Sequence, residues 1–185
     1  MHRRGLGKDD DHAETTRKNK NWRLMNMNED FYQESVDKFI FKVKKGLLYG
    51  ENDVWVRTQG DGSLIGVTDF LQRRGGDVVL VNLPQKGNIV RWGDEISSLE
   101  TIKAIVTVTS PLNGIIVDVN SALNDKPELI NEDPYNHGWL AVVSPSNFEE
   151  DRQHLMSAEK YFELMKSRIQ DEIARSGRKE VQRSV

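Results

Sequence analysis

The chain has 185 residues, with 26 Lys and Arg against 29 Asp and Glu, four His and no Cys. The absence of Cys excludes disulfides, thiol nucleophiles and Cys-based zinc or iron–sulfur sites within this chain. No apolar stretch approaches the roughly 20 residues that span a bilayer, and no pair of His has metal-ligand spacing. We therefore expect no membrane segment and no metal site, so any group-transfer chemistry would need an attached group.

The charge is distributed unevenly along the chain. Residues 1–28 hold seven Lys and Arg against four Asp and Glu, whereas residues 29–170 hold 15 against 22. An acidic body argues against nucleic acid as a partner and favours docking onto basic clefts of other proteins. Residues 1–30 lack apolar periodicity and have neither a secretory signal nor a transit peptide pattern, which predicts a disordered extension on a cytoplasmic protein.

Residues 31–150 are predicted to form one mainly β domain, in which short apolar runs alternate with turns. A short helix should run from Thr68 to Arg74, because Thr68 can cap its start and Gly75 and Gly76 can stop it. Residues 127–135 read as a long connection. The expected strands lie at 54–56, 64–67, 78–81, 89–92, 95–100, 105–110, 115–119 and 139–143.

A helical segment is predicted over residues 151–175, followed by a flexible tail over residues 176–185. Ser146 and Glu149 form a capping-box pair at its start, and Ser157 is a candidate cap if a second helix follows a break. One helix and two helices are both compatible with the pattern. The apolar stripe expected to pack on the β domain consists of Leu155, Ala158, Phe162, Met165, Ile169 and Ile173.

A weak internal repeat frames a protruding hairpin. Residues 87–96 and 114–123 each run from a glycine through an apolar strand to a polar turn and another apolar residue. Between them lies a predicted hairpin with its tip at residues 101–104. Two similar β halves joined in this way predict a flattened barrel or sandwich with Lys103 at its far corner. A lysine amine on a tight turn can be acylated and can then carry a cargo on a flexible arm.

The residues around Lys103 carry a family resemblance. The tip reads Glu-Thr-Ile-Lys-Ala over residues 100–104, Gly87 and Gly114 stand sixteen residues before and eleven after the lysine, and residues 131–139 read NEDPYNHGW. Together these motifs resemble the glycine cleavage system H protein family of the lipoyl-domain superfamily. Biotin carriers of related fold have Met on both sides of their lysine, so the residues beside Lys103 favour lipoate.

The resemblance implies a barrel-sandwich hybrid of two small antiparallel sheets. It implies covalent lipoate on Lys103, with Glu100 recognised by a lipoyl ligase or transferase, and structural turns at Gly87 and Gly114. Because Gly114 follows Pro111-Leu112-Asn113, we expect it to need a positive φ. The chain would be a non-catalytic, monomeric carrier, taking an aminomethyl group from glycine decarboxylase to aminomethyltransferase, with reoxidation by dihydrolipoyl dehydrogenase.

Two departures from the family pattern keep other hypotheses open. The entry strand reads Asp-Val-Trp-Val at residues 53–56 where the family usually has His-Glu-Trp-Val, and residues 70–72 read Phe-Leu-Gln in place of Tyr-Ala-Gln. The alternative is a lipoate-binding sulfur carrier that works with a heterodisulfide-reductase-like complex. A third hypothesis is an unmodified binding module, against which the intact Lys103 and Glu100 argue.

Overall fold

The computed structural model describes the backbone of residues 30–183 and the side chains of residues 30–175, so the predicted extension lies outside the described residues except for Asp30. The strands are β1 (Phe31–Val36), β2 (Phe39–Lys44), β3 (Leu48–Tyr49), β4 (Val54–Gln59), β5 (Gly62–Val67), β6 (Val78–Asn82), β7 (Ile89–Val90), β8 (Glu95–Thr101), β9 (Ile105–Thr109), β10 (Gly114–Val119), β11 (Trp139–Pro145) and β12 (Met156–Ser157). The helices are α2 (Asp69–Gly75), α3 (Leu129–Glu132), α4 (Phe148–Asp151) and α5 (Ala158–Arg183), with 3₁₀ turns η1 (Ser121–Asn124) and η2 (Arg152–His154).

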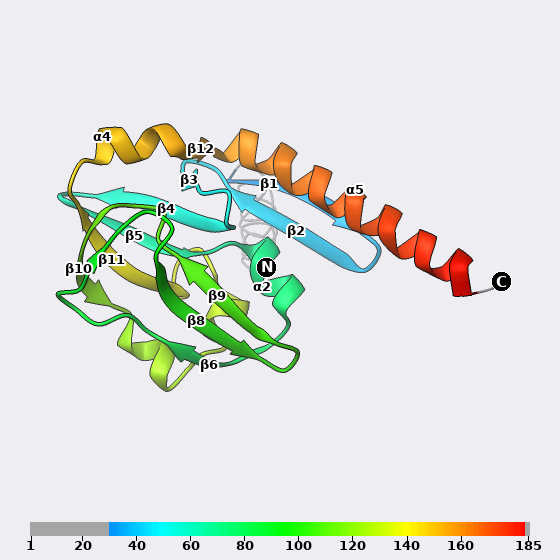
Figure 1. The fold of residues 1–185 in the computed structure, drawn as a ribbon, viewed down its shortest axis with the longest axis horizontal. Coiled ribbons are helices and arrows are strands. Elements are labelled where there is room, and N and C mark those ends of the chain that lie inside the picture. Colours follow the sequence, from blue (N-terminus) through cyan, green and yellow to red (C-terminus); the bar gives the residue numbers. More distant parts are fainter. Residues whose placement is uncertain (1–29, 184–185) are drawn as a thin grey trace, which may run out of the picture.

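Two antiparallel sheets form the body of the protein (Figure 1). One has seven strands in the order β12-β3-β4-β5-β11-β10-β7, and the other has three in the order β6-β8-β9. Inward-facing side chains of both sheets make one core, which includes Val56, Ile65, Leu99, Ile116 and Val143. This alternation of inward and outward residues is what the period of a β-strand produces. The predicted mainly β, lipoyl-type sandwich is confirmed.

A third sheet, the β1–β2 hairpin, was not predicted. It pairs Phe31–Val36 with Phe39–Lys44 and lies with α5 against the outer face of the seven-stranded sheet (Figure 1). A second core forms there, in which the rings of Tyr49 and Tyr161 stack with centroids 4.5 Å apart. The hairpin and α5 therefore cover part of a sheet face that a bare lipoyl-type sandwich would leave exposed.

The C-terminal segment differs in detail from the prediction. Asn147, not Ser146, caps α4, because the Asn147 side chain accepts a bond from the Glu150 amide. A 3₁₀ turn and the short strand β12 then separate α4 from α5, so there are two helices, and Leu155 lies before the second one.

The long helix α5 begins as expected but ends later. Its first turn is capped by Ser157, whose hydroxyl accepts from the Lys160 amide at 3.3 Å. Met165 and Ile169 are buried, whereas Ile173 is 53% exposed. Figure 1 shows that the last part of α5 projects past the sheets. Helical backbone continues to Arg183, beyond the predicted end at residue 175.

The two halves of the internal repeat lie side by side. Strand β7 pairs with β10, with Ile89 opposite Ile115 and Val90 opposite Gly114. Gly87 has a φ of +91°, as a glycine turn requires.

The predicted positive φ at Gly114 is wrong. Gly114 is needed for a different reason, because a Cβ there would lie 2.2 Å from the Ser144 carbonyl oxygen. The backbone of β11 lies this close to Gly114 because the two strands are paired, with Gly114 opposite Pro145 at the end of β11.

Replacing Gly114 by Ala should destabilise the fold. The added methyl group must push β10 away from β11, and overpacking of this kind costs about 1–3 kcal/mol of unfolding free energy. The matched control is Gly50→Ala, where the new Cβ would meet Pro111 Cβ at an ordinary 3.6 Å. Urea unfolding of both variants should show loss at Gly114 alone, and equal unfolding free energies would contradict the close-approach explanation.

Asp53 fastens α5 to the body. This residue has a φ of +62°, and its buried carboxylate accepts bonds from the Tyr161 hydroxyl at 2.8 Å and from Arg168 Nη1 at 2.7 Å. Arg168 also donates to the Glu51 carbonyl, and Tyr161 bonds to the Thr68 hydroxyl. Burial raises the pKa of Asp53, although Tyr161 and Arg168 act in the opposite direction.

This raised pKa makes the stability of the protein depend on pH. An acid whose pKa is higher in the folded state contributes stability below its unfolded value, and that contribution is lost as the pH rises through the folded pKa. Asp53→Asn should fold, since Asn tolerates a positive φ and its Oδ1 can accept the same two bonds. The unfolding free energies of both proteins are measured from below pH 3.8, the ordinary carboxyl value, to neutrality. The value for the variant minus the value for the parent protein should increase as the pH rises. A constant difference would show that Asp53 does not titrate in this way.

Candidate functional site

The candidate lysine lies at the tip of the β8–β9 hairpin, as predicted. Thr101 and Ala104 close the turn through a backbone bond of 2.9 Å. The Thr101 hydroxyl accepts from the amides of Lys103 and Ala104 at 3.2 and 3.1 Å and donates to the Ala104 carbonyl. One threonine side chain therefore holds the whole tip in a single conformation.

A second set of contacts ties the tip to the end of α2. The Ile102 amide donates to the Asp77 carbonyl at 3.2 Å. The Lys103 stem runs along Gly76, whose missing Cβ would lie 3.4 Å from Lys103 Cε. Gly76 ends α2 with a φ of +86°, so the same glycine stops the helix and makes room for the lysine stem.

The lysine stem borders a hollow of about 350 Å³ between the hairpin tip, α2, α3 and the tip of the β1–β2 hairpin. Its lining residues are Phe39, Gln72, Arg73, Gly76, Asp77, Ile102, Lys103 and Asn131. Lys103 is exposed and forms no ion pair with any residue of the described part of the chain. Its ammonium group is therefore free to meet an acylating enzyme.

Asn131 organises the floor of this hollow. Its side-chain amide donates to Gln72 Oε1 at 2.8 Å and to the Gly76 carbonyl at 3.2 Å, and its Oδ1 accepts from the Val78 amide at 2.8 Å. This one side chain thus joins α2 to the start of β6. The NEDPYNHGW motif marked the segment in the sequence, but nothing there assigned Asn131, Thr101 or Gly76 a part in the site.

Glu100 lies three residues before Lys103 on the outward face of the three-stranded sheet. It is half-buried and stands between Leu80 and Ile105 in the strand register. No described residue forms an ion pair with its carboxylate. The structure thus brings Glu100 and Lys103 to the same end of one hairpin, whereas Gly87 and Gly114 lie at the β7–β10 pair.

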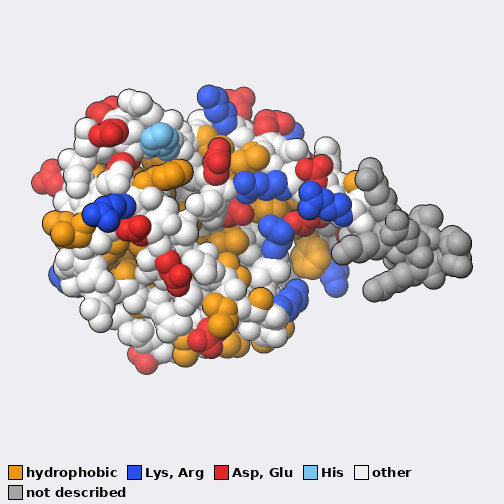
Figure 2. Space-filling view, in the orientation of Figure 1, with side chains coloured by type: hydrophobic (Ala, Val, Ile, Leu, Met, Phe, Trp, Pro, Cys, Tyr) orange, Lys and Arg blue, Asp and Glu red, His pale blue; other side chains and the backbone are white. Residues whose placement is uncertain are grey.

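Hydrophobic side chains surround the hairpin tip. Ile102 and Ile105 are 68% and 69% exposed, and Val79 and Leu80 on β6 are also exposed. Figure 2 shows hydrophobic side chains along the lower edge of the molecule, over the three-stranded sheet. An exposed apolar area of this kind is typical of a surface that contacts other proteins.

The Lys103 amine is chemically suited to acylation. An exposed, unpaired primary amine on a rigid turn can form an amide with a carboxylic acid, and the adjoining hollow is partly apolar. The part of the chain from residue 30 to residue 175 has no cluster of His, Asp or Glu that could hold a metal. No described helix is both long and apolar enough to cross a membrane.

Comparison with known proteins gives the family. The family profile described as glycine cleavage H-protein matches residues 47–168. The chain belongs to the glycine cleavage H-protein family. A probable glycine cleavage system H protein of Pyrococcus abyssi is 43% identical over 128 residues, covering 69% of this chain and 95% of the relative. Glycine cleavage system H protein 4 of Aquifex aeolicus is 37% identical over 147 residues, covering 78% and 81%.

A solved structure agrees with this assignment. The crystal structure of a glycine cleavage system H protein from Mycobacterium marinum superposes with a TM-score of 0.56 at 30% identity, covering 62% of this chain and 92% of that protein. The family match begins at residue 47, after the β1–β2 hairpin, and ends within α5. The hairpin and the end of α5 therefore lie outside the region that the family profile matches, and Phe39 brings the hairpin to the lysine hollow.

Removing the Thr101 hydroxyl should loosen the tip of the H-protein hairpin. Thr101→Val keeps the shape of the side chain but removes its three hydrogen bonds. Amide hydrogen exchange at Lys103 and Ala104, followed by NMR, should accelerate roughly tenfold, since each bond is worth about 0.5–1.5 kcal/mol. Thr101→Ser should retain the slower exchange. Equal exchange in the Val variant and the parent protein would show that the hydroxyl does not hold the turn.

Proposed function

We propose that this H-protein family member carries lipoate on Lys103 and serves as a lipoyl shuttle in glycine cleavage. The observation that supports this most directly is the free, exposed amine of Lys103 on a turn held by Thr101. Amide formation would join the carboxyl carbon of an activated lipoyl group to Nζ, and the activating group would leave together with a proton from the amine. The chain itself performs no catalytic step.

Each part of the site has its own task in this proposal. The Thr101 turn presents Nζ at a defined place, which a modifying enzyme needs because the lysine stem alone is flexible. Glu100 supplies a carboxylate at the same hairpin end for a lipoyl ligase or transferase to recognise. The exposed Ile102 and Ile105 give partner enzymes an apolar surface to dock on.

The attached lipoyl group supplies a disulfide that accepts an aminomethyl group when glycine is decarboxylated. The proposed partners are glycine decarboxylase, aminomethyltransferase and dihydrolipoyl dehydrogenase, and we propose that the carrier acts as a monomer in the cytoplasm. Since the chain has no Cys, no thiol of its own competes with the lipoyl sulfurs for disulfide exchange. In a carrier without Cys, the lipoyl sulfurs on Lys103 would thus be the one thiol–disulfide couple.

A sulfur-carrying role is the second candidate, and the entry strand favours it. The family usually has His-Glu where this chain has Asp53 and Val54. Asp53 is committed to Tyr161 and Arg168, and Val54 is buried in the core with 1% of its surface exposed. Neither side chain is available to a cargo near Lys103. Because of this departure from the family pattern, the second candidate is a sulfur cargo with a heterodisulfide-reductase-like complex as partner.

Lipoylation can be tested by intact mass. Co-expression with a lipoylating system should add the mass of one lipoyl group to the parent protein, and peptide mapping should place it on Lys103. Lys103→Arg should fold but gain nothing, whereas Lys86→Arg, the preceding lysine in the chain, should be modified normally. Glu100→Gln should be modified more slowly, because the enzyme loses a recognised charge.

Two results would contradict the proposal. One is a lipoylated species that persists in Lys103→Arg. The other is a parent protein that neither lipoyl ligase nor lipoyl transferase modifies, while its fold is intact by circular dichroism.

A further inference from the structure

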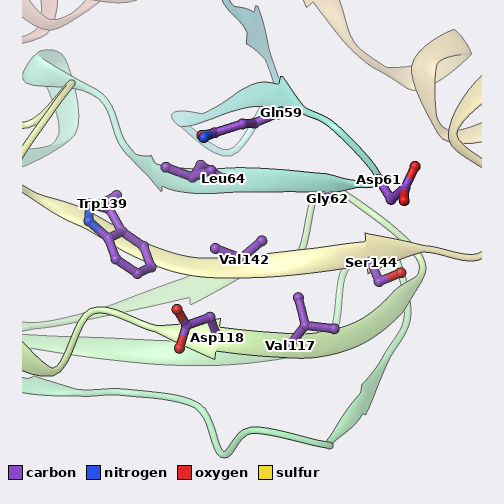
Figure 3. A pocket seen from close by; sticks show the side chains of 9 residues that line it. All are labelled: Gln59, Asp61, Gly62, Leu64, Val117, Asp118, Trp139, Val142 and Ser144. Carbon is purple, nitrogen blue, oxygen red and sulfur yellow. The ribbon is translucent and has the colours of Figure 1, made fainter.

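The hollow beside Lys103 has the size of a small-molecule site. Its volume of about 350 Å³ lies within the range of about 300–1,000 Å³ that such sites have. A larger groove of about 570 Å³ lies over strands β5, β11 and β10, where Leu64, Val117 and Val142 belong to its lining (Figure 3). The groove shares no lining residue with the lysine hollow. A group attached to Lys103 therefore borders the hollow and not the groove.

The lysine stem runs along one wall of this hollow. A Cβ at Gly76 would lie 3.4 Å from Lys103 Cε, 3.5 Å from Lys103 Cδ and 3.6 Å from Ile102 Cγ1. Both side chains of the hairpin tip therefore lie against the end of α2, at the place where Gly76 has no side chain. A group attached to Nζ would begin at this wall, with Ile102 beside it.

Phe39, at the start of β2, gives the hollow a second apolar wall. Its ring lies 6.2 Å from the ring of Phe41, and Phe41 packs edge-on against Phe70 of α2 with ring centroids 5.5 Å apart. The Lys42 amide also donates to the Asp69 carboxylate of α2 at 2.9 Å. The hairpin that carries Phe39 is thus attached to the helix that borders the hollow.

The two apolar walls are exposed in the absence of a bound group. Phe39 is 42% exposed and Ile102 is 68% exposed. An apolar group placed between them would remove part of this surface from water, which favours binding. Sulfur atoms also make favourable contacts with aromatic rings. The alkyl chain and dithiolane ring of a lipoyl group combine both properties.

The polar side chains of the floor are already hydrogen-bonded within the protein. Gln72 donates to Asp69 Oδ1 at 2.8 Å and accepts from Asn131. Asn131 uses its Oδ1 to accept from the Val78 amide, and Arg73 Nε donates to the Asp69 carboxylate. An apolar group can therefore cover these bonded atoms without leaving them unpaired, which would be costly.

We propose that the lipoyl arm of Lys103, in its resting disulfide form, lies in this hollow between Phe39 and Ile102. The inference rests on the proposed function, because it needs lipoate on Lys103. It adds Phe39 as a binding residue for the arm, and Phe39 lies outside the stretch that the family profile matches. Two apolar contacts let a partner enzyme withdraw the arm, and they shield the disulfide from small reductants while the arm is docked.

The test uses the full-length protein after enzymatic lipoylation, with the added mass of one lipoyl group confirmed for each variant. Phe39→Ser removes one wall. Ile40→Ser is the matched control, since Ile40 is the next residue, is 46% exposed and is absent from the lining of the hollow. Reduction of the lipoyl disulfide by a water-soluble trialkylphosphine, followed by the ultraviolet absorbance of the dithiolane ring, should be roughly threefold faster in Phe39→Ser than in the parent protein, because less of the arm is docked. Ile40→Ser should react at the rate of the parent protein.

NMR of the lipoylated parent protein gives a second measurement that does not depend on the variants. Nuclear Overhauser effects should connect the alkyl chain of the arm to the ring of Phe39 and to the methyl groups of Ile102. Equal reduction rates in all three proteins, or an arm without contacts to Phe39, would overturn this inference and leave the proposed function intact. A parent protein that gains no lipoyl mass would contradict the proposed function and this inference with it.

Discussion

The arrangement of the residues around Lys103 depends on the contacts that the Trp55 indole makes with Gly66 and Pro134. The ring lies against Gly66, where a Cβ would come within 2.5 Å of the indole, and its Nε1 donates to the Pro134 carbonyl at 3.0 Å. Pro134 lies two residues beyond α3, whose Asn131 forms hydrogen bonds with α2 and with the start of β6 beside Lys103. A fully buried tryptophan on β4 is thus connected to the segment between α2 and β6, where the Asp77 carbonyl accepts from the Ile102 amide of the lysine hairpin.

The same contact also links the sandwich to the β1–β2 hairpin and α5. Tyr135, next to Pro134, accepts from the Asp69 amide and donates to the Lys42 carbonyl at 2.6 Å, so the β1–β2 hairpin is attached through the loop that Trp55 holds. Asp53, two residues before Trp55, binds α5 through Arg168. The β1–β2 hairpin and α5 are therefore anchored by residues beside Trp55 and Pro134, and they extend toward the side that carries Lys103 (Figure 1). A protein that docked at Lys103 would therefore meet the β1–β2 hairpin and α5 as well.

Local chemistry explains which features the sequence could predict. The helix at Asp69–Gly75 follows from a threonine cap and two glycines, and the β8–β9 hairpin follows from two alternating strands around a short turn. Features that depend on distant contacts were missed. The β1–β2 hairpin packs against α5, more than a hundred residues later, as the stacking of Tyr32 on Phe162 shows, and also against α2. The positive φ predicted at Gly114 was wrong, and the close approach of β11 to this glycine could not be read from the sequence of the turn that precedes it.

The most direct test of the account is reconstitution with glycine decarboxylase. Carbon dioxide release from carboxyl-labelled glycine should depend on the lipoylated protein and should be absent with Lys103→Arg, because the decarboxylase needs an acceptor for the aminomethyl group. Unlipoylated protein is the control for adventitious stimulation. If the lipoylated protein supports no release while a heterodisulfide-reductase-like complex oxidises sulfur bound to it, the glycine cleavage assignment of this carrier is contradicted and its cargo is sulfur.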